Sequence, residues 1–309
     1  MLSLEEVLEE QRALDRLCAD RTLETVELFE WNAFYGHAAI LKAITGLPVD
    51  RPLFVTLPHG VTFLGRPNAA ELHANIGTAY SYQREYDEAL SIGGARMVIR
   101  GAAPFTYLPH LLGPAPAHRS GVLYFPSHST RYTTVEAGYD RLAEMLCALP
   151  AHLGPVRVCC YYMDVLRGHH RPFLERGIPV YSAGHQYDPL FLVRLWHLLS
   201  MHRHVMSNAH GTHLAYAMFA GCSFTFLDTP DARYVAAPGY EDWVITAPPA
   251  FKTLHDQLFA DGRTCDDPAS QAAAVDLIGA ARQLPPERLR QLLVAADRRE
   301  QLRRSAGVV

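Results

Sequence analysis

One plan repeats four times in the second half of the sequence. Each copy is an apolar run of strand length, then a polar or glycine-containing turn, then a stretch with helical periodicity. The four strand-and-turn segments read GVLYFPSHST, VRVCCYYMD, IPVYSAGHQYDP and HVMSNAHGTH, and CSFTFLD adds a fifth strand. Strands that alternate with helices form right-handed crossovers and a parallel sheet. The sequence therefore predicts a doubly wound α/β domain.

The same periodicities predict a second, smaller α/β unit in the first half. Its candidate strands are PLFVTLPHGV, TAYSYQ and ARMVIRGAAP. Helical patterns are expected at 3–18, 33–46 and 84–92 there, and at 133–148, 164–176, 187–201 and 211–220 in the second half. Three further helical patterns follow near the end of the chain, at 247–260, 268–282 and 285–304.

A proline-rich stretch separates the two halves. Residues 109–121, PHLLGPAPAHRSG, do not favour regular structure and suit a linker between domains. We therefore expect an α/β domain over 1–118, a second α/β domain over 119–230 and a C-terminal helical extension over 231–309. The predicted fold class is α/β, with two Rossmann-like doubly wound domains that face a cleft.

Composition limits the kind of ligand. The 309 residues are 49% hydrophobic, enough for a large core, and the formal net charge is −4 with no block of Lys or Arg. This balance argues against broad electrostatic binding of nucleic acid or of an anionic membrane. The six Cys form no CxxC pair, the N-terminal segment resembles neither a signal nor a transit peptide, and no apolar run reaches membrane-spanning length. We expect a cytoplasmic protein with a small-molecule ligand.

The turns that follow the predicted parallel strands carry the candidate site. In an open parallel sheet, ligands bind beyond the carboxyl ends of the strands, where turns lead into helix N-termini. A helix N-terminus offers unpaired N–H groups and about half a positive charge, which suits a phosphate. The turn residues that we assign to phosphate or nucleotide binding are Ser127, His128, Ser129, Thr130, Tyr161, Ser207, Asn208, Gly211 and Thr212.

The turn after the fourth strand is the most specific of these. Gly211 allows close approach of the backbone, and Thr212 places a hydroxyl at the start of a helix. The alternative is that Ser207, Asn208 and Thr212 are ordinary N-cap residues. Four polar turns on one sheet edge favour the phosphate interpretation at least as much as the capping one.

Histidine is unusually frequent, with 16 in the chain. The pairs His169 with His170 and His210 with His213 raise the possibility of zinc, but no acidic or Cys partner stands at ligand spacing and no HExxH occurs, so we predict no metal site. His59, at the end of the strand PLFVT, is the candidate general base, because imidazole titrates near neutral pH. Its alternative role is a hydrogen bond within the turn.

Acidic residues compete with His59 for the role of base. Glu27 and Glu30 alternate with apolar residues and could point toward the same site, although an exposed strand face explains the pattern better. Glu71 lies in a stretch that looks solvated. The chain contains no GxxxxGK[ST], GxGxxG or GxSxG motif, so kinase, dinucleotide-dehydrogenase and esterase interpretations rank low.

Three segments together carry a family resemblance: GVLYFPSHSTRYTT, YSAGHQYDPLFL and MSNAHGTHLAYAMFAGCSFTFLD. In this pattern the chain resembles bacterial glycosyltransferases of the GT-B fold, of the type found with capsule and lipopolysaccharide biosynthesis. LPHGV likewise looks like the His-Gly turn of their acceptor-side domain. The resemblance implies a nucleotide-sugar donor, and the absence of a Glu after the 207–213 turn brings CMP-linked donors into consideration beside UDP- and GDP-linked ones.

The resemblance also implies a mechanism. A sugar would move from the nucleotide donor to an acceptor hydroxyl, helix N-termini would take up the charge of the leaving phosphate, and no metal or other cofactor would be required. His59 would deprotonate the acceptor, and His185 would protonate or hydrogen-bond the leaving phosphate. Peripheral association with a membrane or a complex, and oligomer formation, stay open.

Two alternatives belong to other functional classes. A nucleotide-sugar epimerase or hydrolase would use the same phosphate site, with His59 and His185 as the acid/base pair. A non-catalytic sugar- or nucleotide-binding subunit would bind the donor without turning it over. A shared scaffold cannot decide among these functions.

Overall fold

The computed structural model describes residues 2–62, 67–92, 96–227, 229, 232–239, 255–256, 258–259 and 264–307. The chain divides into two compact units. Unit 1 comprises Met1–Arg21, Ala115–Gln186 and Leu190–Gln271, and unit 2 comprises Thr22–Pro114, Tyr187–Pro189 and Ala272–Val309.

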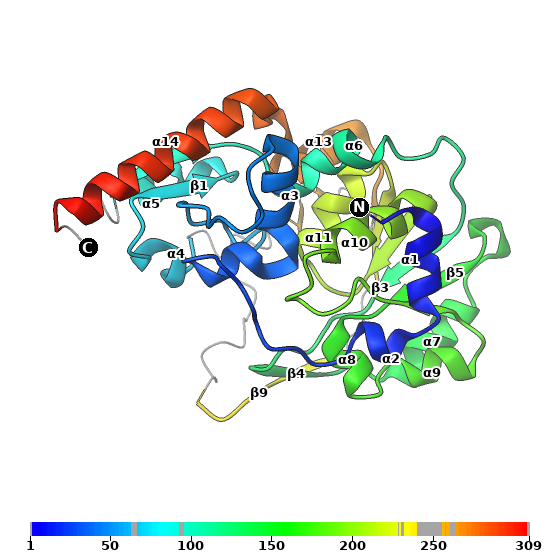
Figure 1. Ribbon diagram of the computed structural model, residues 1–309. Helices are drawn as coiled ribbons and strands as arrows, with labels where there is room; N and C mark the ends of the chain where they lie inside the picture. Colours follow the sequence, from blue (N-terminus) through cyan, green and yellow to red (C-terminus); the bar gives the residue numbers. More distant parts are fainter. Residues whose placement is uncertain are drawn as a thin grey trace. The chain divides into compact units, whose positions relative to one another are not determined.

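A six-stranded sheet lies at the centre of unit 1 (Figure 1). Its strand order is β10-β8-β7-β3-β5-β6, and every neighbouring pair is parallel except β10 with β8. The strands are β3 (Val122–Phe125), β5 (Val156–Cys159), β6 (Val180–Tyr181), β7 (His204–Ser207), β8 (Ser223–Phe226) and β10 (Thr264–Cys265). The prediction of an α/β fold with a parallel sheet is confirmed for this unit.

The strand order reverses direction at β3. From β3 the chain moves outward to β5 and β6, then returns to the other side of β3 to form β7 and β8. Because parallel crossovers are right-handed, the two directions place their helices on opposite faces, as Figure 1 shows. The connecting helices are α7 (Tyr139–Cys147), α8 (Tyr162–Leu166), α9 (Arg171–Glu175), α10 (Phe191–Met201) and α11 (Thr212–Phe219). A topological switch point therefore lies between β3 and β7.

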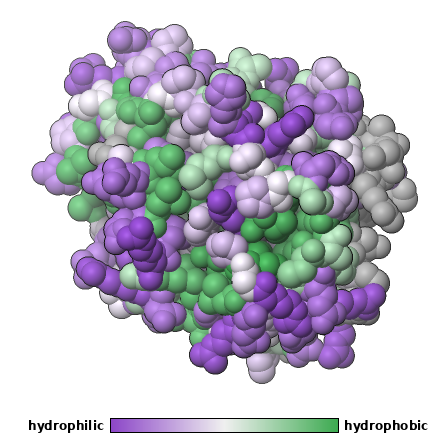
Figure 2. Space-filling model, turned by 90° about the vertical axis from the view of Figure 1, so that its right-hand side faces the viewer, coloured by the Kyte–Doolittle hydropathy of each residue, from purple (hydrophilic) through white to green (hydrophobic). Residues whose placement is uncertain are grey.

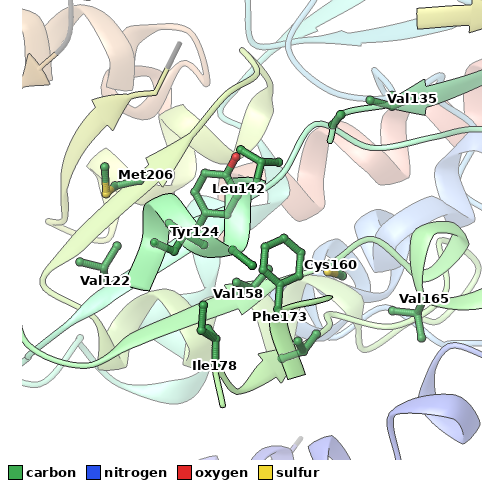
Figure 3. Packing of buried hydrophobic residues seen from close by; sticks show 14 of the residues in the cluster. Val122, Tyr124, Val135, Leu142, Val158, Cys160, Val165, Phe173, Ile178 and Met206 are labelled. Atoms are coloured by element: carbon green, nitrogen blue, oxygen red, sulfur yellow. The ribbon is translucent and has the colours of Figure 1, made fainter. Parts of the chain in front are cut away.

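One face of the sheet packs against α7, α8 and α9 (Figure 3). Alternate residues of the strands point into this core, so that Val122 and Tyr124 of β3 join Val158 of β5. The helices contribute Leu142 and Phe173, among others, and both side chains are at most 1% exposed. Alternation with a period of two is thus what fixes the β3 and β5 register against the helices.

The N-terminal segment covers the β6 edge of the sheet. Its helices are α1 (Leu4–Gln11) and α2 (Leu14–Leu17), and α1 begins with a capping box between Ser3 and Glu6. Gln11 Oε1 accepts a hydrogen bond from Ser182 N at 2.7 Å, just beyond β6. This bond satisfies a backbone donor on the edge strand, which explains why residues 1–21 belong to unit 1 and not to the first-half domain that the sequence predicts.

Among its described residues, unit 2 contains fewer strands than the three that the sequence predicts. Its described strands are β1 (Thr78–Ser81) and β2 (Met97–Arg100), which are parallel, and Thr56 adds a single bridge to Ala79. The described helices are η1 (Glu30–Gly36), α3 (His37–Thr45), α4 (Ala69–His73), η2 (Arg84–Tyr86), α5 (Asp87–Ile92), η3 (Pro104–Tyr107), α6 (Leu108–Leu112), η6 (Ala280–Arg282) and α14 (Pro286–Ser305). Helix α13 (Pro268–Asp276) begins in unit 1 and ends in unit 2. A doubly wound sheet and the facing arrangement of two such domains therefore stay predictions for this unit.

The C-terminal helix α14 belongs to unit 2 and packs on α3. Glu300 is fully buried and accepts a hydrogen bond from Gly77 N at 3.0 Å, ahead of β1. The predicted separate extension over 231–309 is therefore divided, because its first part lies in unit 1 and its last helix completes unit 2. The expected helix at 247–260 lies largely outside the described residues.

Three element predictions need correction. The first part of the predicted helix at 133–148 is instead strand β4 (Thr133–Glu136), which pairs antiparallel with β9 (Arg233–Ala236), because its β-branched residues favour extended backbone. The predicted helix at 164–176 is split into α8 and α9 at Gly168, whose φ is 78°. The linker starts later than predicted, because Pro109 lies in the first turn of α6, where proline is tolerated.

The surface is mixed in character. Figure 2 shows hydrophilic residues over much of one face, with hydrophobic residues gathered in patches between them. Five of the six cysteines are buried and all six are free. In the described part of the chain, no helix combines the length and the apolar character needed to cross a bilayer.

Candidate functional site at the switch point of unit 1

The loops that follow β3 and β7 are joined by one side chain. Asn208 is 7% exposed, and its Oδ1 accepts a hydrogen bond from Ser127 N at 2.6 Å. Its Nδ2 donates to Ser127 Oγ at 3.1 Å and to Thr229 Oγ1 at 2.9 Å. Asn208 therefore fixes three loops at the point where the strand order reverses, which is where doubly wound sheets bind ligands.

The other buried hydroxyls stabilise the same loops. Ser207 is fully buried, and its Oγ donates to Phe125 O at 2.8 Å. Ser129 is also fully buried, and its Oγ accepts a hydrogen bond from Val135 N at 3.1 Å. The structure places four predicted residues in the loops at this sheet edge: Ser127, Ser129, Ser207 and Asn208. Their side chains form hydrogen bonds within these loops, so other groups would have to contact a ligand.

The start of α11 presents backbone N–H groups with no side-chain cap. Gly211 is the N-cap residue, and because it has no side chain it makes no side-chain cap for the first turn. The capping interpretation of Ser207 and Asn208 therefore does not describe this helix, since both bond within the loops instead. A Cβ on Gly211 would lie 2.8 Å from His213 Nδ1, so the loop has no room there for a larger residue. Thr212 is half-buried at the first helical position.

Two other predicted residues lie in the loop after β3. His128 is exposed, and its ring centroid lies 4.6 Å from that of Tyr161, which follows β5. Thr130 is half-buried, and its Oγ1 accepts hydrogen bonds from Tyr132 N and Thr133 N, both at 3.1 Å. His128, Gly211 and Thr212 therefore remain as the predicted residues best placed to meet a ligand.

Tyr161 and His185 occupy the β5 and β6 side of the same edge. The Tyr161 hydroxyl donates to Gln186 Oε1 at 2.8 Å. His185 is fully buried, and its Nε2 lies 3.4 Å from Asp20 Oδ1. Burial lowers the pKa of His185, and the nearby Asp20 carboxylate opposes that change. A direct contact between His185 and a leaving phosphate would require the ring to move.

The two histidines of the 207–213 turn pack against aromatic rings. The His213 ring stacks on Phe125 at a centroid distance of 5.0 Å, and burial lowers its pKa to about 3. The His210 Nε2 lies 2.9 Å from His255 Nδ1, and burial lowers the pKa of His210 to about 4. Both rings are therefore neutral near pH 7. Among the residues that the structure describes, no three His, Cys, Asp or Glu side chains cluster as metal ligands.

An Asp–His pair at this edge was missed by the sequence analysis. Asp164 of α8 is 1% exposed. Its carboxylate accepts a hydrogen bond from Ser129 N, which lies 3.2 Å from Oδ1 and 3.1 Å from Oδ2. His169 Nδ1 lies 3.0 Å from Asp164 Oδ1. Asp164 ends the second of the four strand-and-turn segments, and His169 was considered only as a metal ligand; their spacing of five residues across a turn was the signal that links them.

The candidate base His59 lies in unit 2, among aromatic side chains. Its Nε2 lies 3.3 Å from the Tyr35 hydroxyl, and the Trp31 ring centroid is 5.2 Å away. His59 N donates to Glu71 Oε1 at 3.2 Å. The view of Glu71 as solvated is wrong, because it is 4% exposed and burial raises its pKa.

Tyr35 is held in an uncommon backbone conformation. Its φ is 58°, and it is the only residue other than glycine with positive φ in the described part of the chain. Gly36 follows with φ of 82°, and a Cβ there would meet Pro189 O at 2.1 Å. A left-handed non-glycine residue costs about 1–3 kcal/mol and persists only where its surroundings enforce it. This backbone conformation is found in the residue whose hydroxyl lies beside His59.

Glu27 and Glu30, the predicted competitors of His59, differ from each other. Glu27 is 8% exposed and pairs with Lys42 at 2.5 Å, so the expectation of an exposed face is wrong for it. Glu30 is exposed. The Glu27 carboxylate is engaged by Lys42 Nζ and by Leu53 N.

Comparisons with known proteins add no relative: no protein-family model matches the chain, and no curated protein matches it.

Proposed function

We propose that the protein is a glycosyltransferase that moves a sugar from a nucleotide-activated donor to an acceptor hydroxyl. The fold alone would not choose this activity, because one α/β scaffold supports many chemistries. The choice rests on the chemistry of the switch point of unit 1 together with the sequence pattern described above.

The observation that carries the proposal is the Asn208 bridge beside the start of α11, where glycine is the N-cap residue. Asn208 holds the loops after β3 and β7 together, and the first turn of α11 is left without a side-chain cap. Backbone N–H groups at a helix start attract an anion, and here they stand next to the exposed His128. These features suit the phosphates of a nucleotide donor.

The charge of the departing phosphate would be stabilised mainly by fixed dipoles. N–H groups that are already oriented do not have to reorganise as negative charge develops on the leaving oxygen. Gly211 keeps the backbone accessible at that point, and Thr212 supplies a hydroxyl at the first helical position. The donor would be CMP-, UDP- or GDP-linked.

His59 is the proposed base toward the acceptor hydroxyl. Its Nε2 shares a hydrogen bond with the Tyr35 hydroxyl, which orients the ring, and its backbone N–H is held by Glu71. A correctly placed base contributes about 100-fold or more to turnover. We propose a cytoplasmic location as well, where nucleotide-activated donors are available.

A thermal-shift screen against CMP, CDP, UDP, GDP and dTDP compounds tests the donor class, because a ligand that binds only the folded state raises its stability. We expect one nucleotide family to raise the melting temperature.

The variants His128→Ala and Thr212→Val test the residues of the site. Each should weaken the binding of that nucleotide by about 1–3 kcal/mol, the value of a charge-assisted hydrogen bond. His152→Ala is the matched control, because His152 is exposed in η4 (Ala151–Leu153), just ahead of β5 at the amino edge of the sheet.

The outcomes separate the functional classes. No response to any nucleotide, or unchanged binding in both His128→Ala and Thr212→Val, would contradict the proposed site. Release of free sugar or isomerised donor without an acceptor would indicate an epimerase or hydrolase. Tight donor binding with no turnover under any acceptor condition would indicate a binding subunit.

A further inference from the structure

We propose that His169, oriented by Asp164, is a phosphate-binding residue of unit 1. The inference rests on the proposed function only in taking a phosphate-bearing compound as the ligand. It assigns a role to two side chains that the resemblance and the predicted turns leave out.

The two residues form a carboxylate-oriented imidazole. Asp164 is 1% exposed, and a buried carboxylate of this kind needs paired donors. It receives two of them from the backbone N–H of Ser129 and the Nδ1–H of His169. Because Nδ1 is committed to Asp164, the Nε2 atom of the same ring is directed away from the carboxylate.

The ring is held from a second side. The Tyr139 ring, at the start of α7, stacks on the His169 imidazole at a centroid distance of 4.5 Å and an interplanar angle of 27°. The His169 side chain is 23% exposed, and no hydrogen-bond partner of Nε2 is found among the described residues. An imidazole fixed on one nitrogen and one face, with the other nitrogen accessible, is pre-organised for a ligand.

The neighbouring charges favour an anionic ligand. Arg167 is exposed and donates through Nη2 to Thr130 O at 3.2 Å, so its guanidinium lies against the loop after β3. Arg131 is exposed in that same loop. The acidic group nearest to His169 is Asp164 itself, which is already engaged. In the protonated form, His169 keeps Nδ1–H on Asp164 and offers Nε2–H to a phosphate oxygen.

The pair is also linked to the switch point. Asp164 holds Ser129 N, and Ser127, two residues earlier, is held by Asn208. Loss of Asp164 would therefore disturb both the orientation of His169 and the loop after β3. In this role Asp164 is a positioning residue, and His169 is the residue that touches the ligand.

Site-resolved modification by diethyl pyrocarbonate tests the inference on the full chain. The reagent acylates accessible neutral imidazole nitrogen, and peptide mass analysis reports each histidine separately. We expect His169 to react in the absence of ligand and to be slowed about fivefold or more by saturating inorganic pyrophosphate. His152, exposed at the opposite sheet edge, should react equally with and without pyrophosphate.

Matched variants separate ligand contact from a structural effect. His169→Ala should raise the dissociation constant of pyrophosphate about tenfold, the loss of one charge-assisted hydrogen bond. His169→Gln retains an N–H donor in a similar place and should stay within about threefold of the parent chain. Asp164→Asn should raise the constant as well and should change the modification rate of His169.

The results also distinguish this inference from the proposed function. If a nucleotide binds but His169 reacts equally with and without ligand, and His169→Ala binds normally, the inference is wrong and the function stands. If pyrophosphate protects His169 but no nucleotide stabilises the chain, the function is wrong and the inference stands. If neither pyrophosphate nor any nucleotide binds, both are overturned.

Discussion

Buried polar groups have different structural roles in the two units. In unit 1 they gather at the carboxyl edge of a parallel sheet, where Asn208 and Asp164 hold loops beside an uncapped helix start. In unit 2 they hold the chain where few strands are present. Glu27 accepts Leu53 N at 2.9 Å and Lys42 Nζ at 2.5 Å, and Asn32 donates to Val55 O at 2.8 Å.

The difference shows how to separate stability from function. A regular sheet satisfies its own backbone, so polar side chains at its edge are available to shape a site. In unit 2, where the described sheet has two strands and one bridge, polar side chains supply the hydrogen bonds that neighbouring strands would otherwise give to the backbone. Substitutions of the buried Glu27 and Asn32 in unit 2 should therefore cost mainly folding free energy, whereas substitutions at the unit 1 switch point should cost mainly ligand affinity.

Glu27→Gln should have the largest effect on stability. It leaves the Lys42 ammonium, 4% exposed, without a charged partner, and breaking a buried ion pair from one side costs about 3–5 kcal/mol. Urea unfolding followed by fluorescence measures this loss. Glu24→Gln, an exposed change three residues earlier, should alter stability by less than about 0.5 kcal/mol. Equal effects of the two variants would contradict the stabilising role of the buried Glu27–Lys42 ion pair.

Acid should destabilise the protein through its buried histidines. Burial lowers the pKa of His202 in unit 1 to about 4 and that of His37 in unit 2 to about 3. The unfolded chain binds protons near pH 6.5 and the folded chain does not, so stability is complete above about pH 6.5 and falls as pH decreases toward these folded values. Each such histidine contributes on the order of 2 kcal/mol between pH 7 and 5.

The urea midpoint at pH 7 and pH 5 measures this dependence. His202→Gln should reduce the difference between the two midpoints, because the titrating group is removed while a donor for Leu198 O remains. His152→Gln, at an exposed position, should leave the difference unchanged. A midpoint that is flat or rises toward pH 5 would show that these histidines are protonated in the folded chain.

Asn208→Ala should cost less stability than Glu27→Gln but more binding. Removal of its hydrogen bonds leaves Ser127 N without its acceptor, at about 1–3 kcal/mol. Pyrophosphate and nucleotide affinity should fall at the same time, since the loops after β3 and β7 lose their bridge. Calorimetric titration of Asn208→Ala and Glu27→Gln with the same ligand compares the two units directly. Parental affinity in Asn208→Ala would contradict the role of the switch point in binding.

His59→Asn sharpens the comparison from the side of unit 2. Turnover should fall about 100-fold or more while nucleotide affinity and melting temperature stay near those of the parent chain. Initial rates at saturating donor measure the first effect. A loss of nucleotide affinity in this variant would place His59 in donor binding and not in acceptor activation.

The parallel sheet of unit 1 was predictable because its signal is local. Apolar runs followed by polar turns mark β3, β5, β6, β7 and β8. The prediction that the turns with Ser127 and Asn208 lie on one sheet edge follows because parallel strand ends share an edge. What those side chains do was not predictable. Hydroxyls that were interpreted as ligand contacts or helix caps form hydrogen bonds within the loops. The sequence could not show this, because the partner of Ser207 Oγ, Phe125 O, lies 82 residues away in sequence.

The structure of unit 2 depends on interactions that sequence patterns do not record. Glu71 lies in a stretch that looks solvated and Glu27 in one that resembles an exposed strand face, yet tertiary packing buries both. At Gly36, the residue after Tyr35, a side chain is excluded by Pro189 O, which is far away in sequence. The Asp164–His169 pair was hidden for a related reason, since a helix break at Gly168 brings the two side chains together.

Backbone amide shifts in a nitrogen-15-labelled sample test the central claim most directly. On titration with pyrophosphate, and with whichever nucleotide stabilises the chain, the largest shifts should fall on residues 127–130 and 210–213, the loops that flank the switch point between β3 and β7. The claim is contradicted if these amides stay unshifted while the ligand binds, or if the shifts concentrate at the amino edge of the sheet, around Arg119 and Arg203.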